Sequence, residues 1–306
     1  MHASLRALTD ELKRLKASGV KSLAVSEDSL ARLRTAVAAR TPAAAPPPAG
    51  STRPEAPVTV PEYRAPVRTF AAKPVPPPES PLPAPVPFTL PDGDKAARWA
   101  ALRDRILGDP VCRAQVRPGK QVVFGVGSLE AKIMFVGEAP GAEEEVQGEP
   151  FVGPAGQLLT KMINGMGLKR EEVYIGNIMN WRPAMPADER GVQYGNRPPT
   201  APELAYCLPY LKAQIEVVNP GLLVALGATA AQGLLGADAF KALGEIRGQW
   251  REFAGRPLMV TYHPSYILRN QSNRSKRLIW EDLLKVMERA SLPVSEKQRG
   301  FFLDRG

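Results

Sequence analysis

Four short apolar segments recur from residue 131 onward, and each ends at a glycine or a polar residue. They cover residues 131–136, 173–175, 222–226 and 258–262. Runs of this length, rich in branched and aromatic side chains, are typical of strands that are buried on both faces. The pattern therefore predicts four strands of a buried sheet.

Between these segments, apolar residues recur every three or four positions, as they do on one face of a helix. This spacing predicts helices over residues 155–166, 202–218 and 277–289, and an alanine-rich helix after Gly227. Strands that alternate with helices of this length form parallel sheets covered on both faces. We therefore expect a three-layer α/β/α domain with a central four-stranded, mainly parallel sheet. Ligands of such folds bind at the carboxyl ends of the strands.

The first 92 residues follow a different pattern. Leucines at helical spacing from Leu5 to Leu15, and a second helical pattern after Gly19, predict a hairpin of two helices. Seventeen of the 32 prolines then lie within residues 41–91, so this stretch is expected to be a disordered tether. The predicted organisation is a helical hairpin (1–40), a Pro/Ala-rich linker (41–92), the α/β domain (93–290) and a C-terminal tail (291–306).

Composition narrows the classes of function. The net charge of +9 and the isoelectric point near 9.6 favour a polyanionic partner such as nucleic acid. No apolar run reaches the roughly 18 residues that span a membrane, and the N-terminus begins a charged helix rather than an apolar signal core. Two cysteines, Cys112 and Cys207, are too few for a disulfide framework. We expect a soluble, cytoplasmic protein.

An acidic loop, Gly137–Glu145, follows the first predicted strand. It lacks the glycine pattern and the Lys-Ser/Thr pair of phosphate-binding loops, and its four glutamates would repel a phosphate. Such a loop suits a reaction that develops positive charge, for example the cleavage of a glycosidic bond. An ordinary turn between a strand and a helix is the alternative.

Two residues have side chains suited to a nucleobase. Phe151 lies among turn-forming residues before a predicted helix, where it either joins the core or offers a face on which a flat base stacks. Asn177 ends the second predicted strand, where it either caps a turn or presents a donor and an acceptor that match a pyrimidine edge.

His263 ends the fourth predicted strand and, apart from His2, is the only histidine of the chain. A metal site or a Ser-His-Asp triad is hard to build without a second histidine. A structural turn is one role for such a residue. The other is to donate a hydrogen bond to an oxygen that becomes negative as a base departs.

The segments Tyr266–Asn270 and Arg274–Arg277 follow this histidine. An apolar pair flanked by arginines suits a wedge that enters a base stack while the cations hold phosphates. A surface turn that opens the last helix is the alternative.

Taken together, these motifs resemble the uracil-DNA glycosylase superfamily, and most closely its family 4, whose members usually carry an iron–sulfur cluster. The resemblance covers about residues 95–290, including Val122–Gly127 and Leu226–Ala228. It implies the superfamily's three-layer fold and a hydrolase that flips uracil out of single- or double-stranded DNA and removes it.

The resemblance also implies roles for individual residues: Phe151 stacks on the base, Asn177 reads the uracil edge and His263 donates to uracil O2. Glu138 positions the water or supports the cationic sugar. The residues assigned in this way are catalytic Glu138, His263 and Glu144; uracil-binding Gly137, Ala139, Phe151 and Asn177; and DNA-binding Ser265, Tyr266, Ile267, Leu268, Arg269, Arg274 and Lys276.

One departure from the family concerns its cofactor. Family members bind a four-iron cluster through four cysteines, whereas this chain has only Cys207 at such a position and Cys112 near the usual pair. Trp181 occupies a usual cysteine place, and two thiols do not supply the four thiolates that the cluster takes. We expect no cofactor and no metal, with Trp181 filling the vacated volume. Glu145, where the family usually has aspartate, is a smaller departure.

Two alternatives to a uracil-DNA glycosylase stay open. One is a glycosylase-like module that binds damaged DNA with little turnover, and the other is an enzyme for another deaminated base such as hypoxanthine. In each case the expected partner is DNA, no membrane is involved and the chain is a monomer. The helices of residues 1–40 offer a docking element for a protein partner.

Overall fold

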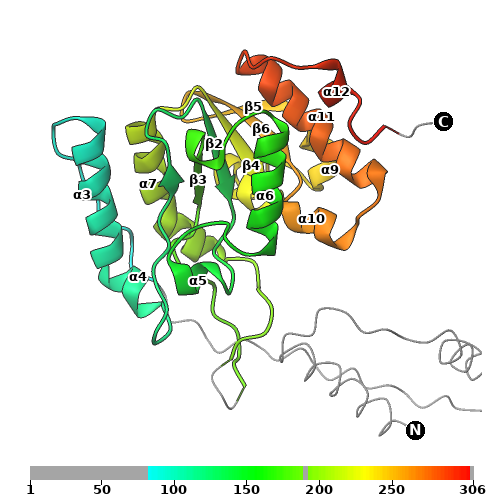
Figure 1. The fold of residues 1–306 in the computed structure, drawn as a ribbon. Coiled ribbons are helices and arrows are strands. Elements are labelled where there is room, and N and C mark those ends of the chain that lie inside the picture. Colours follow the sequence, from blue (N-terminus) through cyan, green and yellow to red (C-terminus); the bar gives the residue numbers. More distant parts are fainter. Residues whose placement is uncertain (1–81, 189–191, 304–306) are drawn as a thin grey trace, which may run out of the picture. The chain divides into compact units, whose positions relative to one another are not determined.

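A computed structural model describes residues 82–188 and 192–303 (Figure 1). The predicted hairpin (1–40) and most of the predicted linker (41–92) lie outside these ranges. Residues 82–91 contain neither helix nor strand, and the first described helix, α3 (Lys95–Gly108), begins after the N-cap Asp94.

The core of the fold is a six-stranded sheet with the order β1-β3-β2-β4-β6-β5. Its strands are β1 (Val126–Gly127), β2 (Ile133–Gly137), β3 (Tyr174–Asn177), β4 (Leu222–Leu226), β5 (Trp250–Phe253) and β6 (Arg256–Thr261). The four central strands are parallel to one another, which confirms the four predicted strands and their direction.

The sequence pattern did not predict the two edge strands, which are antiparallel to their neighbours. β1 is only two residues long. β5 carries Arg and Glu between its aromatic ends and is only half-buried. It is joined to β6 by Ala254 and Gly255, which both have positive φ (49° and 70°), as a two-residue hairpin turn of the primed type requires.

Helices cover both faces of the sheet (Figure 1). The larger elements are α6 (Pro154–Gly165), α7 (Ala201–Val218), α8 (Ala228–Leu235), α10 (Pro264–Arg269) and α11 (Asn273–Arg289). The short ones are α4 (Pro110–Ala114), α5 (Glu144–Gln147), α9 (Leu243–Ile246), α12 (Glu296–Arg299) and the 3-10 turn η1 (Arg170–Glu172).

The two faces form separate cores because successive side chains of a strand point to opposite sides. Ile133 and Phe135 of β2 pack with α6, α10 and α11, whereas Met134 and Val136 pack with α7 and α8. A third apolar cluster joins α3, α4 and α7. Both layers of helices predicted from the apolar spacing are therefore present.

Residues 291–303, predicted to be a tail, pack against α11. The indole Nε1 of Trp280 donates to the Gln298 carbonyl at 2.6 Å, and Phe301 lies on Trp280 with ring centroids 5.2 Å apart. Within the described part of the chain, none of the helices combines the length and apolar character needed to cross a bilayer.

Candidate active site

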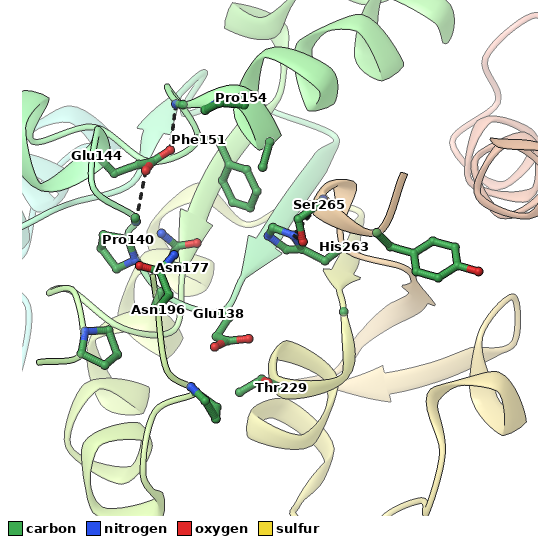
Figure 2. Close-up of a pocket in the computed structure, with 18 of the residues that line it drawn as sticks. Glu138, Pro140, Glu144, Phe151, Pro154, Asn177, Asn196, Thr229, His263 and Ser265 are labelled. Carbon is green, nitrogen blue, oxygen red and sulfur yellow. Dashed lines mark hydrogen bonds between the residues drawn. The ribbon is translucent and has the colours of Figure 1, made fainter. Parts of the chain in front are cut away.

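A cavity of about 670 Å³ opens at the carboxyl ends of the parallel strands (Figure 2). The strand register places these ends together, since Gly137 of β2 pairs with Asn177 of β3 and Leu226 of β4 pairs with Thr261 of β6. The predicted residues that line the cavity are Glu138, Ala139, Glu144, Phe151, Asn177, His263, Ser265, Tyr266 and Arg269. The structure thus brings together most of the residues that the motifs singled out.

Gly137 allows the base-stacking and base-reading candidates to meet. A Cβ at this position would lie 2.3 Å from Asn177 Oδ1 and 2.5 Å from Phe151 Cζ. Both distances are far below van der Waals contact, so only glycine fits here. The glycine that ends β2 is therefore required by the close approach of Phe151 and Asn177.

Phe151 is held in a strained backbone conformation, with φ of 56°. A non-glycine residue in this region costs on the order of 1 kcal/mol and is found most often at functional sites. The carbonyl of Phe151 lies so close to Gly156 that a Cβ there would be 1.8 Å away. The ring is buried, and its centroid lies 5.6 Å from that of His263.

Asn177 is 6% exposed, and its Oδ1 has no hydrogen-bond partner among the residues that the structure describes. A buried acceptor without a partner destabilises a protein by about 1–3 kcal/mol. Such a group is explained when a ligand supplies the missing donor. Asn177 lines the cavity, so a ligand bound there is a possible source of that donor.

His263 has a defined tautomer. The backbone N–H of Ser265 donates to His263 Nδ1 at 3.1 Å, and the Ser265 hydroxyl lies 2.8 Å from the same nitrogen. In the neutral ring the proton is then on Nε2. Burial, with the Arg269 charge adding to it and the Glu144 charge opposing it, lowers the pKa of His263 to about 4. The imidazole is neutral at pH 7, and it faces Phe151 across the cavity (Figure 2).

Glu138 follows β2 and faces the same cavity. Burial raises the pKa of its carboxyl group, and a hydrogen bond from the Thr229 side chain opposes that rise. The sequence pattern did not single out Thr229, although it lies two residues after Gly227, the glycine that follows β4. Its position near the carboxyl end of a strand was the feature of the sequence that could have indicated a role in the site.

Glu144 differs from its predicted role. One carboxylate oxygen accepts the backbone N–H groups of Val152 and Gly153 at 3.0 and 2.9 Å, and the other accepts that of Gly141 at 3.1 Å. The first oxygen therefore ties Glu144 to the turn that carries Phe151, and the second fixes the acidic loop itself. These contacts show a positioning role for Glu144, and the catalytic role expected from the sequence stays a prediction.

The segment after His263 forms α10 and opens α11. Ile267 is 6% exposed and belongs to the core, which contradicts its predicted place in an apolar wedge, whereas Leu268 is 40% exposed. The helix turns the two neighbouring side chains to different sides. Arg274 and Lys276 lie in the first turn of α11 and do not line the cavity.

Asn196 also lines the cavity, and the sequence pattern did not predict it. It belongs to the loop between β3 and α7, which has no periodic apolar spacing. Its Oδ1 accepts from Arg182 Nε at 2.8 Å. Figure 2 labels Asn196 and Asn177 among the side chains that line the cavity.

The positions expected to bind a cluster lie in the third apolar cluster. Cys112, Trp181 and Cys207 are at most 1% exposed and pack with Tyr206 and Tyr210. The neighbouring Cys207 thiol, together with burial, raises the pKa of Cys112 well above its usual value, whereas a metal ligand must be a thiolate. In residues 82–188 and 192–303, no three His, Cys, Asp or Glu side chains form a metal-binding group. These residues do not fit a four-iron cluster held by four cysteines.

Comparison with known proteins identifies the family. The sequence model of the uracil DNA glycosylase superfamily matches residues 124–284. A type-4 uracil-DNA glycosylase of Thermotoga maritima is 44% identical over 167 residues, which cover 54% of this chain and 81% of that protein. The type-4 enzyme of Saccharolobus solfataricus is 38% identical over 179 residues (56% and 77%), and the type-5 enzyme of Pyrobaculum aerophilum is 30% identical over 180 residues (54% and 73%). The matched region contains all the sequence motifs whose residues line the cavity. This chain therefore belongs to the uracil-DNA glycosylase superfamily, with type-4 members among its relatives.

Proposed function

We propose that this chain is a DNA-repair hydrolase that flips uracil out of DNA and cleaves its N-glycosidic bond, leaving an abasic site. The observation that carries the proposal is the buried, unpartnered Oδ1 of Asn177 beside Phe151 and His263, within the described part of the chain. The relatives named type-4 uracil-DNA glycosylases support the same activity.

Recognition of the base follows from hydrogen bonding. Uracil presents an N3–H donor next to its O4 acceptor, and an asparagine amide presents the complementary acceptor and donor. Uracil N3–H would give the Asn177 Oδ1 the partner that it lacks. The Phe151 ring offers an apolar face for the flipped base.

Cleavage moves the electron pair of the C1′–N1 bond onto uracil, so that O2 gains negative charge and deoxyribose becomes oxocarbenium-like. The Nε2–H of neutral His263 donates to O2, and this hydrogen bond strengthens as the charge develops. The Glu138 carboxylate stabilises the cationic sugar. Water then bonds to C1′, and the proton that it loses ends on the uracil anion.

A panel of labelled oligonucleotides tests the proposal. Each carries a single uracil, hypoxanthine or mismatched thymine and is treated with alkali after incubation, which cleaves at abasic sites. We expect cleavage at uracil, in single-stranded and duplex DNA. Tight binding to uracil DNA without cleavage would favour a module that binds damaged DNA with little turnover. Cleavage at hypoxanthine in place of uracil would favour an enzyme for another deaminated base.

We propose further that the enzyme works without an iron–sulfur cluster. The support is the presence of two cysteines in the whole chain and the burial of Trp181 in the same apolar cluster. Protein purified without oxygen should contain less than about one iron per chain. It should also show no absorbance band near about 400 nm, where iron–sulfur clusters absorb. A content of about four irons per chain would contradict this proposal.

The remaining expectations concern the setting of the enzyme. We propose that it acts as a cytoplasmic monomer. We also propose that residues 1–40 dock onto a partner protein that is bound to the same DNA. A linker that joins a docking element to an enzyme raises the local concentration of its substrate. Removal of residues 1–40 should then leave turnover on short oligonucleotides unchanged, and loss of that turnover would contradict a pure docking role.

A further inference from the structure

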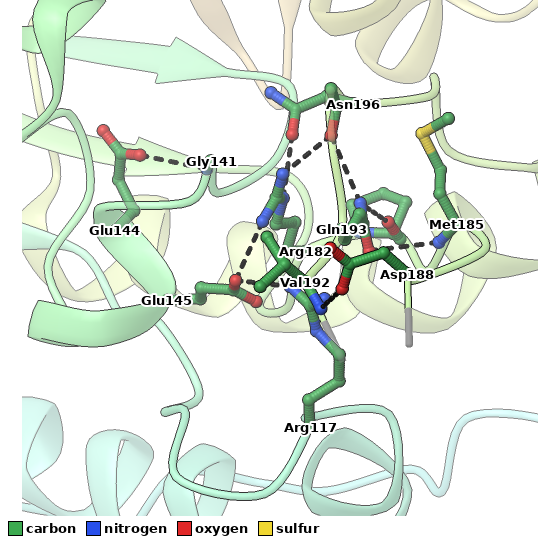
Figure 3. A network of polar contacts seen from close by, with 12 residues as sticks. Arg117, Gly141, Glu144, Glu145, Arg182, Met185, Asp188, Val192, Gln193 and Asn196 are labelled. Carbon is green, nitrogen blue, oxygen red and sulfur yellow. Dashed lines mark hydrogen bonds and ion pairs between the residues drawn. The ribbon is translucent and has the colours of Figure 1, made fainter. Parts of the chain in front are cut away.

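A buried ion-pair cluster lies behind the cavity wall and joins three loops (Figure 3). The Glu145 carboxylate accepts from Arg182 Nη1 at 2.9 Å and from Arg117 Nη2 at 2.5 Å, through the same oxygen. The side chains of Arg182 and Glu145 are 4% and 6% exposed. Two guanidinium groups thus share one carboxylate, and the pair of Arg182 and Glu145 is buried whereas the Arg117 side chain is 26% exposed.

Arg182 uses each of its nitrogens in this cluster. Nε donates to Asn196 Oδ1 at 2.8 Å, Nη2 donates to the Gly195 carbonyl at 2.7 Å, and Nη1 donates to Glu145. The planar guanidinium therefore fixes the positions of three acceptors relative to one another. One of them is the side chain of a residue that lines the cavity.

The contact with Arg182 determines which way the Asn196 amide faces. A guanidinium has only donors, so the amide oxygen must face it and the NH₂ group must face the other way. Asn196 Nδ2 accordingly points toward the acidic loop, 3.9 Å from where a Cβ on Gly141 would lie (Figure 3). The two N–H bonds of this NH₂ group thus lie at the cavity wall, where they can donate to oxygen atoms of the substrate or of water.

Stability alone does not explain such a cluster. A buried ion pair contributes little net stability, because desolvation of the charges offsets their attraction, and an apolar cluster of the same volume serves as well. An apolar cluster could not, however, hold an amide in one of its two orientations. The loop that carries Asn196 is also held at its base by Gln193, whose Nε2 donates to the Pro183 carbonyl at 3.1 Å and whose Oε1 accepts from the Met185 N–H at 3.1 Å.

We propose that Arg182, anchored by Glu145, is a positioning residue that orients the Asn196 amide into the cavity for the reaction. This inference rests on the proposed glycosylase function and adds a device to it that no motif of the sequence indicated. Arg117 completes the charge arrangement from the segment after α4. Glu145, which is one methylene longer than aspartate, brings one carboxylate oxygen within hydrogen-bond distance of both guanidinium groups.

A double-mutant cycle tests the proposal, with the single-turnover rate of uracil release at saturating DNA as the readout. Asn196→Ala should lower this rate by about 10²-fold, as the loss of one donor to a reacting oxygen does. Arg182→Lys keeps the charge but cannot bridge three acceptors, and we expect a fall of about tenfold in rate with little change in KM. The double variant should be no slower than Asn196→Ala alone, because Arg182 acts through Asn196.

Arg247→Lys is the matched control for a structural arginine. Arg247 also binds one buried carboxylate, that of Asp282, and one carbonyl, that of Leu278, and it does not line the cavity. It should lower the melting temperature without lowering the rate. If Arg182→Lys does not fold, Glu145→Gln replaces it in the cycle, since a neutral amide no longer pairs with the Arg182 and Arg117 guanidinium groups as the carboxylate does.

The outcomes separate this inference from the proposed function. No uracil release by the wild-type chain would contradict the proposed function itself. An active wild type with an equally fast Arg182→Lys variant would overturn the positioning role alone. Additive losses in the double variant would also overturn it, because they would show that Arg182 and Asn196 act independently.

Discussion

Two regions of this protein contain residues that the resemblance to the family singled out, and they differ in what surrounds their polar groups. In the cavity at the strand ends, Asn177 Oδ1 lacks a partner within the described chain and Phe151 has a positive φ. In the region of Cys112 and Cys207, the Asp109 carboxylate accepts from Tyr206 and Tyr210 at 3.0 and 2.7 Å and also caps α4. The unpartnered atom of the first region belongs to a residue that lines a cavity, whereas Trp181 in the second region is enclosed in the third apolar cluster.

The difference is whether a cavity adjoins the strained or unpartnered group. A ligand in the cavity can supply the donor that Asn177 Oδ1 lacks and can offset the strain at Phe151. In the second region Trp181 fills the interior at 1% exposure, although its Nε1 has no partner among residues 82–188 and 192–303. Apolar packing and the hydrogen bonds of Asp109 therefore stabilise the region of Cys112 and Cys207.

The largest effect is expected from His263→Ala, which removes the donor to the departing uracil. The rate of uracil release should fall by about 10²–10³-fold while the fold is retained, since one such donor stabilises the transition state by that amount. Single-turnover kinetics at saturating DNA measure this, with far-UV circular dichroism as the folding control. A loss smaller than tenfold would contradict the role of His263.

The next effect concerns pH and Glu138. Burial raises the pKa of its carboxyl group above 4.5, and the group acts as a carboxylate. The rate should therefore fall by about tenfold per unit as pH drops below that raised pKa. His263, with a pKa of about 4, stays neutral through most of this range. A pH–rate profile checks this, and Glu138→Gln should remove the acid limb. An unchanged limb in that variant would assign it to another group.

The third prediction contrasts the two regions directly. Trp181→Ala should lower the free energy of unfolding by about 3–5 kcal/mol, as large-to-small changes in a core do, with the rate of the folded enzyme within about threefold of wild type. Phe151→Ala should lower the rate much more. Urea unfolding and single-turnover assays of both variants measure the contrast. A Trp181 variant that is stable but inactive would reverse the assignment of the two regions.

Much of the fold was predictable because its central strands are buried on both faces. Segments such as 222–226 then consist of apolar residues only, and β4 has the predicted bounds. β5 was missed because Arg251 and Glu252 on an exposed edge break that pattern. The edge of a sheet is a tertiary property, which no local spacing records.

The site was predictable where its residues end strands and unpredictable where they act through loops. Phe151, Asn177 and His263 follow or precede regular elements, so motif spacing found them. The loop-fixing contacts of Glu144 could not be predicted, because its partners are backbone N–H groups up to nine residues away. Arg182 and Asn196 meet only through the folding of an aperiodic loop.

The most direct test of the central claim is the effect of Asn177 on uracil release, because its unpartnered Oδ1 carries the proposed function. Asn177→Ala removes both hydrogen-bonding groups, and we predict a fall of at least about tenfold in kcat/KM for uracil DNA. Because the variant also removes a buried orphan acceptor, it should fold at least as stably as the wild type. A fully active, stable Asn177→Ala protein would contradict the account.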